Sequence, residues 1–227
     1  MDFSAVKNIV IPEGIVKSIS AGGKTIWKKS RLPSGYTEIS FIKGTGTQWI
    51  DTGLKIADVD RVEGEFSFSE FSTGNKNFYV FGARNTNNTA VGFAVYNYSH
   101  GGFTFYPLEW EIGTSISKDV KVKYSSTIKN GSQEFYVNDT EIYSNTKSLS
   151  NLRGDNTYGI FCLNGTTPDY FAEGSFYPHI CYKGNNKVGE FIPAINDTTS
   201  EIGVYDLVSN TFLGNAGMGE FIAGEPV

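Results

Sequence analysis

The sequence has few charged residues and no long apolar segment, and each of these shortages argues against a class of protein. Lys, Arg, Asp and Glu make up 19% of the 227 residues, against about 25% in an average soluble domain. The net charge of −5 disfavours a nucleic-acid partner, because binding phosphates requires a basic surface. No apolar run approaches the ~20 residues that span a membrane. The N-terminus lacks the basic start and apolar stretch of a signal peptide, so we expect maturation in a cytoplasm.

Cysteine and histidine are also scarce: the chain has Cys162, Cys181, His100 and His179. Two cysteines are too few for a disulfide framework, and in a reducing cytosol they are predicted to be buried thiols. A single bridge between them after release from a cell stays open. The four residues together could complete a zinc site, although neither CxxC nor HxxxH spacing supports one.

Aromatic residues and glycine are abundant, and their arrangement predicts strands. The chain is 15% aromatic and has 26 Gly; aromatics pack well on pleated surfaces and Gly supplies turns. Apolar and polar residues alternate with a period of two in the predicted strands Val62–Ser69, Val91–Tyr96, Val120–Tyr124 and Gln133–Val137. No segment predicts a convincing helix. The pattern favours an all-β fold of two antiparallel sheets packed as a sandwich or jelly roll.

The segment Tyr124–Tyr143 carries the clearest local signal. Asn130-Gly131 predicts a tight hairpin turn after a strand that ends at Lys129. Asn138-Asp139 predicts a second turn. Together they predict a three-stranded antiparallel meander.

Residues 1–30 form a candidate separate unit, a small N-terminal β segment ahead of a domain over residues 31–227. A basic stretch ending at Arg31, followed by Pro33-Ser34-Gly35, predicts a linker between the two. The segment is too short to bury a core by itself. We therefore expect it to attach to another surface through its apolar residues, which include Ile9, Ile11, Ile15, Ile19, Ile26 and Trp27.

Motifs at the two ends of the main domain resemble a known family. Leu32–Glu38 (LPSGYTE) and Gly44–Gly53 (GTGTQWIDTG) are similar to the opening of concanavalin A-like, laminin-G-like domains in bacteriophage and prophage structural proteins, with Trp49 in place of a tyrosine. The closing pattern of that group is matched by Phe191–Ala194 (FIPA), Val204–Val208 (VYDLV), Phe212 and Asn215–Gly219 (NAGMG). The resemblance covers about residues 32–224.

Two weaker likenesses accompany these motifs. Phe135–Asp139 (FYVND) is similar to a hairpin of laminin-G-like folds, and Ile19–Trp27 looks like short leaders that precede domains in phage proteins of Gram-positive hosts. The resemblance implies a concanavalin A-like jelly roll in a virion protein of a tail, fibre or capsid surface, assembled in the bacterial host cytoplasm. It implies that residues 1–30 attach to other virion proteins and that many copies or a homo-oligomer are present. It does not imply a ligand, because this fold carries many unrelated functions.

A host-surface glycan is the predicted ligand. Aromatic rings stack on sugar faces, and Asn, His and Tyr groups complete the hydrogen bonds. One stretch of the sequence offers that mixture, and its candidate carbohydrate-binding residues are Tyr96, Asn97, Tyr98, His100, Tyr106 and Trp110. The sequence predicts no cofactor; calcium held by Asp58 and Asp60, or by Asn196 and Asp197, is an alternative, although no twelve-residue calcium loop is present.

No catalytic residue is predicted, so we expect a binding protein and not an enzyme. A glycosidase of this fold needs paired acids on one strand face, and the nearest stretch has Glu109 and Glu111 without a third acid. Glu63 and Glu65 also share a face but are predicted to be solvated. Two alternatives stay open: a glycoside hydrolase of the same fold, or a decoration protein without a ligand.

Overall fold

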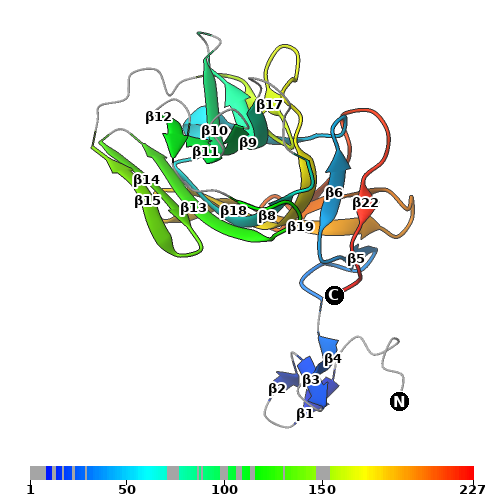
Figure 1. The fold of residues 1–227 in the computed structure, drawn as a ribbon. Coiled ribbons are helices and arrows are strands. Elements are labelled where there is room, and N and C mark those ends of the chain that lie inside the picture. Colours follow the sequence, from blue (N-terminus) through cyan, green and yellow to red (C-terminus); the bar gives the residue numbers. More distant parts are fainter. Residues whose placement is uncertain are drawn as a thin grey trace.

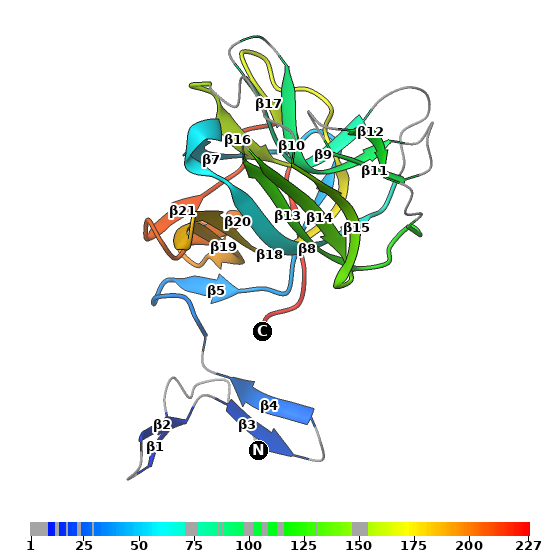
Figure 2. The same cartoon turned by 90° about the vertical axis from the view of Figure 1, so that its left-hand side faces the viewer.

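The chain forms two large sheets and two small strand pairs (Figures 1 and 2). The computed structural model describes residues 9–11, 14–16, 18–21, 24–28, 30–70, 77–85, 87, 89–97, 102–105, 109–112, 116–129, 131–146 and 154–227. For the strands up to residue 28, and for residues 94–97, 102–105 and 109–112, it describes the backbone. Within this part of the chain the helical element is a single turn of 3-10 helix, Ile56–Asp58; no helix there is long and apolar enough to cross a membrane.

The larger sheet has eleven strands. Its main path is β15 (Thr140–Asn145), β14 (Ser132–Val137), β13 (Val122–Lys129), β8 (Arg61–Phe68), β18 (Glu173–Lys183), β19 (Asn186–Asn196), β20 (Ile202–Asp206) and β21 (Thr211–Leu213). Three short strands join it at the side: β5 (Tyr36–Glu38) pairs with β19, and β6 (Ile42–Thr45) pairs with β18 and β22 (Ile222–Ala223). All of these pairings are antiparallel.

The smaller sheet has seven strands. Its path is β12 (Glu109–Ile112), β11 (Gly102–Phe105), β10 (Ala90–Asn97), β9 (Asn77–Arg84), β16 (Thr157–Ile160) and β7 (Ile50–Lys55). The short β17 (Leu163–Asn164) runs parallel to β9 at its side. The fold is therefore all-β, with two antiparallel-rich sheets packed together as in a sandwich.

Aromatic side chains fill the space between the sheets. Phe81 of β9 packs against Tyr158 of the same sheet at 4.7 Å between ring centroids and faces Phe191 of the larger sheet at 6.4 Å. All three are buried. The Ser126 hydroxyl of β13 donates to the carbonyl oxygen of Phe93 on β10 at 3.1 Å, which adds a buried polar contact between the sheets. The abundance of aromatics thus supplies the core, since each ring buries a large apolar area.

The strands expected from period-two alternation are present, with one boundary corrected. β8, β10 and β14 confirm the first, second and fourth predicted strands. The prediction that a strand begins at Val120 is wrong: β13 begins at Val122, and Val120 is 51% exposed. The N–H of Val120 donates to the carbonyl oxygen of Ser117. Asp119, which lies between them, has a φ of +57°. A turn therefore occupies this position.

The predicted meander is confirmed as β13, β14 and β15. Its second turn has both central residues in the left-handed region, with φ of +48° at Asn138 and +64° at Asp139. Asn and Asp tolerate this conformation better than other non-glycine residues do.

The prediction for the two cysteines is also confirmed, because Cys162 and Cys181 are separate buried thiols.

The two family-like end motifs meet in one hydrogen-bonded joint. The buried Gln48 side chain accepts from the N–H groups of Thr45 and Thr47 and donates to the carbonyl oxygen of Glu220. The Asn215 side chain accepts from the N–H of Trp49 at 3.2 Å. These contacts therefore join the segment between β6 and β7 to the segment between β21 and β22.

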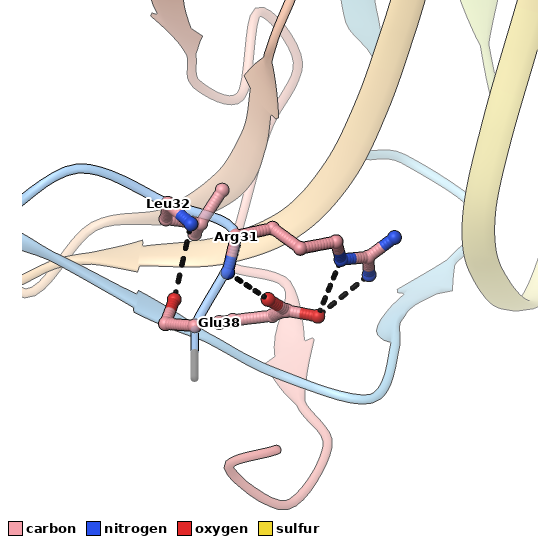
Figure 3. Close-up of polar contacts among 4 residues, drawn as sticks. Arg31, Leu32 and Glu38 are labelled. Carbon is pink, nitrogen blue, oxygen red and sulfur yellow. Dashed lines mark hydrogen bonds and ion pairs between the residues drawn. The ribbon is translucent and has the colours of Figure 1, made fainter. Parts of the chain in front are cut away.

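Arg31 is anchored to the sandwich by a buried carboxylate. The Glu38 side chain is 1% exposed and accepts from three Arg31 groups: the backbone N–H at 3.0 Å, Nε at 2.9 Å and an Nη at 2.6 Å (Figure 3). Leu32 is buried beside it against Ile192 and Tyr205.

Four short strands precede Arg31 and form two pairs. β1 (Ile9–Ile11) pairs with β2 (Gly14–Val16), and β3 (Ser18–Ala21) pairs with β4 (Lys24–Lys28).

The Arg31–Glu38 contact gives a stability prediction. Replacing Arg31 with Ala leaves the Glu38 carboxylate buried without its cation, and we expect the free energy of unfolding to fall by about 2 kcal/mol. The value is below that of a fully buried pair because the Arg31 side chain is 38% exposed. Urea denaturation measures the change. Adding Glu38→Gln to Arg31→Ala should recover part of the loss, since the buried charge is then gone; no recovery would contradict the explanation.

Candidate functional site

A polar pocket lies at one end of the smaller sheet, and we call it the rim pocket. Its volume is about 540 Å³. Three loops that are distant in the sequence build it: the end of β9, the approach to β16, and the connection from β17 to β18. Its lining residues are Arg84, Asn85, Asp155, Asn156, Thr166, Thr167 and Asp169.

Backbone and side-chain contacts hold the pocket walls in place. The Asn156 amide donates to the Arg84 carbonyl oxygen at 2.8 Å, which ties two of the loops together. Asn85 accepts from the N–H of Thr89 at 2.8 Å and so closes the β9–β10 turn. Leu163 and Asp169 exchange two backbone hydrogen bonds, which fixes the start of the third loop. The pocket is therefore preformed in the sandwich.

Asp169 is the charged group of the third loop. One of its oxygens, Oδ2, accepts from the Arg84 guanidinium. The other, Oδ1, is enclosed and has no hydrogen-bond partner. A buried acceptor without a donor costs about 1–3 kcal/mol, so a ligand hydroxyl that donated to this oxygen would be stabilising.

Tyr170 follows Asp169 and has a strained backbone. Its φ is +53°, a left-handed conformation that is a clear outlier for a bulky residue. The ring is 38% exposed, packs on Tyr79 at 6.1 Å between centroids, and has the Arg84 guanidinium 5.8 Å from its centroid. Strain of this kind clusters at ligand sites, and an exposed ring beside a polar pocket offers a stacking surface.

A second recess lies on the outer face of the larger sheet, and we call it the sheet groove. Its volume is also about 540 Å³. One row of half-buried side chains crosses five adjacent strands in it: Tyr136, Ser125, Glu63, Ile180 and Glu190. The remaining lining residues are Arg31, Gly64, Glu65, Lys123, Tyr124, Asp139, Pro178 and Ile192.

Carboxylates outnumber cations among the groups that line the groove. Four carboxylates against the two cations Arg31 and Lys123 give a net lining charge of −2. Glu63 has Arg61 at 3.3 Å and Glu65 has Lys121 at 2.8 Å, so each is paired with a cation. A glycosidase acid needs surroundings that keep it protonated, and these ion pairs do not favour that role.

Neither the protein-family models nor the curated proteins contain a match to this chain.

Three of the six predicted carbohydrate-binding residues lie on described strands of the smaller sheet. Tyr96 and Asn97 lie on β10 and Trp110 on β12, with β11 between them. Tyr98, His100 and Tyr106 lie outside the described residues. Asn97 pairs with Asn77, while Arg84 pairs with Ala90 at the other end of the same hairpin. Seven residues of β9 separate Asn77 from Arg84, and each adds about 3.3 Å along a strand. The rim pocket at Arg84 is thus roughly 23 Å from the predicted stretch at Asn97.

The rim pocket was not predicted from the sequence. The available sequence signal was Asp169-Tyr170, since an acid and an aromatic stand together in a loop rich in Gly and Thr.

The predicted attachment residues lie on the four leading strands, with Ile19 opposite Trp27 in the β3–β4 pair and Ile26 on β4. Ile9 and Ile11 lie on β1 and Ile15 on β2.

The oxygens considered for calcium already accept hydrogen bonds within the chain. Asp58 accepts from a backbone N–H, and Asp60 accepts from a backbone N–H and from Lys183 at 2.8 Å. Asn196 accepts from two backbone N–H groups, and Asp197 accepts from a threonine hydroxyl at 2.7 Å. These contacts give each of the four side chains a structural role within the chain.

His179 is a buried group beneath the sheet groove. It is completely buried, with Nδ1 2.6 Å from the Tyr177 carbonyl oxygen. A carbonyl only accepts, so Nδ1 carries the proton and Nε2, which has no partner, is an acceptor. Burial lowers the pKa of His179 from 6.5 to about 3, although the Tyr177 hydrogen bond raises it. The ring is therefore neutral near pH 7 and part of the core.

Proposed function

We propose that this chain is a structural protein of a bacteriophage or prophage particle whose sandwich binds a host-surface glycan at the rim pocket. The observation that carries the glycan site is an unpartnered oxygen of Asp169 in that pocket, followed directly in the chain by Tyr170, which is part-exposed and has a strained backbone. Sugar hydroxyls donate to carboxylates and amides, and sugar faces stack on aromatic rings. Asn156, Thr166 and Thr167 add polar groups to the same wall.

We further propose that the sandwich is a concanavalin A-like jelly roll. The motifs that carry the resemblance are structural in this chain: Gln48 and Asn215 join the two ends of the domain, and the buried Asp206 accepts from the N–H groups of Glu190, Val208 and Ser209. A fold motif is expected to serve packing in this way. The packed antiparallel-rich sheets are consistent with the proposal. The virion setting rests on the resemblance alone.

We propose a binding role and not catalysis. Glu109 and Glu111 lie on β12, and no third acid adjoins them in the sequence. Glu63 and Glu65 share the groove but are both ion-paired. The competing proposals are a glycoside hydrolase and a decoration protein without a ligand.

The experiment screens the full chain against bacterial surface polysaccharides and titrates the best oligosaccharide by calorimetry. We expect Tyr170→Ala and Asp169→Asn each to weaken binding about tenfold or more, which corresponds to 1.4 kcal/mol. Tyr136→Ala, which removes a half-buried tyrosine from the sheet groove, is the matched control and should bind as the unchanged chain does. Melting temperatures show that the variants are folded.

Each alternative has its own outcome. Reducing ends released from the polysaccharide, and lost in Glu111→Gln, would support the hydrolase. Binding that survives both rim-pocket substitutions would move the site elsewhere. No binding to any polysaccharide would leave the decoration protein as the better proposal.

A further inference from the structure

The chain divides into a basic leader and an acidic sandwich. Residues 1–30, which we call the leader, contain five lysines, Asp2 and Glu13, for a net charge of +3. The whole chain has 19 basic and 24 acidic residues, so residues 31–227 have 14 and 22, for a net charge of −8. One copy of this protein therefore attracts the leader of another through opposite charge.

The leader strands need a surface to pack on. They form two two-stranded pairs, β1–β2 and β3–β4, and an isolated two-stranded pair is marginal in water. In Figures 1 and 2 both pairs lie outside the two packed sheets. In sequence, the leader combines branched apolar residues with lysines, as in Lys24–Lys28 (KTIWK).

The sheet groove has the chemistry that such a segment requires. Ile180 and Pro178 are half-buried and give it apolar surface, and the carboxylates of Glu63 and Glu65 lie on the same sheet face. Isoleucine and tryptophan side chains are stabilised when apolar surface of this kind covers them. Lysines beside them would meet these carboxylates, which already pair with Arg61 and Lys121 at part-exposed positions and would then be shared with a second cation. The rim pocket, which is lined by polar side chains, offers no comparable apolar surface.

We propose that the sheet groove binds the leader of a second copy of this chain, so that copies join head to tail. Arg31 lines the groove and is tied to the buried Glu38, which fixes the exit of a copy's own leader at the groove margin. The strand pairs of its own leader lie outside the two packed sheets, so the groove is open to a neighbour. A contact between two different surfaces of identical copies is heterologous. When each copy repeats it, the copies form either an open filament or a closed ring. The inference rests on the proposed assembly role of the leader and is independent of the glycan site.

Charge reversal in the full chain tests the contact by sedimentation velocity over a concentration series in low salt. We expect Lys24→Glu/Lys28→Glu in the leader to weaken self-association about tenfold or more, and Glu63→Lys/Glu65→Lys in the groove to do the same, because like charges are then opposed. A chain that carries all four changes should associate again. The control, Glu201→Lys/Glu225→Lys, adds the same charge to the sandwich at exposed positions outside the groove and should associate as the unchanged chain does.

Three outcomes would overturn the inference. The first is a chain that stays monomeric at concentrations up to about 1 mM, since even a weak contact with a Kd of about 1 mM would be visible there. The second is unchanged association in the groove variant, and the third is failure of the fourfold variant to recover while it still melts cooperatively. Glycan binding measured on the same variants separates the two proposals, because the leader and groove changes leave the rim pocket intact.

Discussion

Replacing Gly64 with Ala is expected to lower the free energy of unfolding by about 3 kcal/mol, at the upper end for overpacking of a core. A Cβ atom at position 64 would lie 2.3–2.4 Å from three atoms of the His179 ring. The ring cannot move aside, because it is completely buried, stacks on Phe176 at 3.9 Å and has Tyr124 at 5.3 Å between centroids. Urea denaturation monitored by tryptophan fluorescence gives the free energy.

The matched control is Gly184→Ala. Gly184 has a φ of +58° and nothing within 4 Å of an added Cβ, so it reports the backbone cost alone, about 1–2 kcal/mol. The double variant Gly64→Ala/His179→Ala should cost less than the sum of its single changes, since the colliding ring is gone. A strictly additive double variant would show that the collision is not the cause.

The second large effect is a loss of stability in acid that His179 carries. In the unfolded chain the imidazole has a pKa near 6.5, and in the folded protein burial lowers the pKa to about 3. Between these two values the unfolded state binds a proton that the folded state does not, so stability is complete above pH 6.5 and falls as the pH falls. The expected slope is about 1.4 kcal/mol per pH unit, or about 4–5 kcal/mol by pH 3.

The measurement is the free energy of unfolding of the unchanged chain and of His179→Leu from pH 7.5 to pH 4. Leu cannot titrate, so the difference between the two chains should shrink or reverse in sign as the pH falls. His100→Leu, at the other histidine of the sequence, shows which of the two carries the effect. Parallel pH profiles for the unchanged chain and His179→Leu would contradict a buried neutral imidazole.

The local structure of this protein follows from its sequence to a large extent. Period-two alternation identified β8, β10 and β14, because a strand with one buried face must place apolar residues at every second position. The turn residues identified the meander of β13 to β15, since Asn138 and Asp139 tolerate positive φ. The boundary at Val120 was wrong because the turn at Asp119 depends on contacts that alternation does not encode.

The tertiary structure alone decided which strands are neighbours and where the recesses lie. Alternation says which face of β8 is buried, and it does not say that β8 lies between β13 and β18. The rim pocket needs Arg84, Asp155 and Asp169 in one place, although more than 80 residues of chain separate the first from the last. The neutral state of His179 likewise follows from its complete burial, because removal from water disfavours the charged imidazole and only the packed sheets remove it from water.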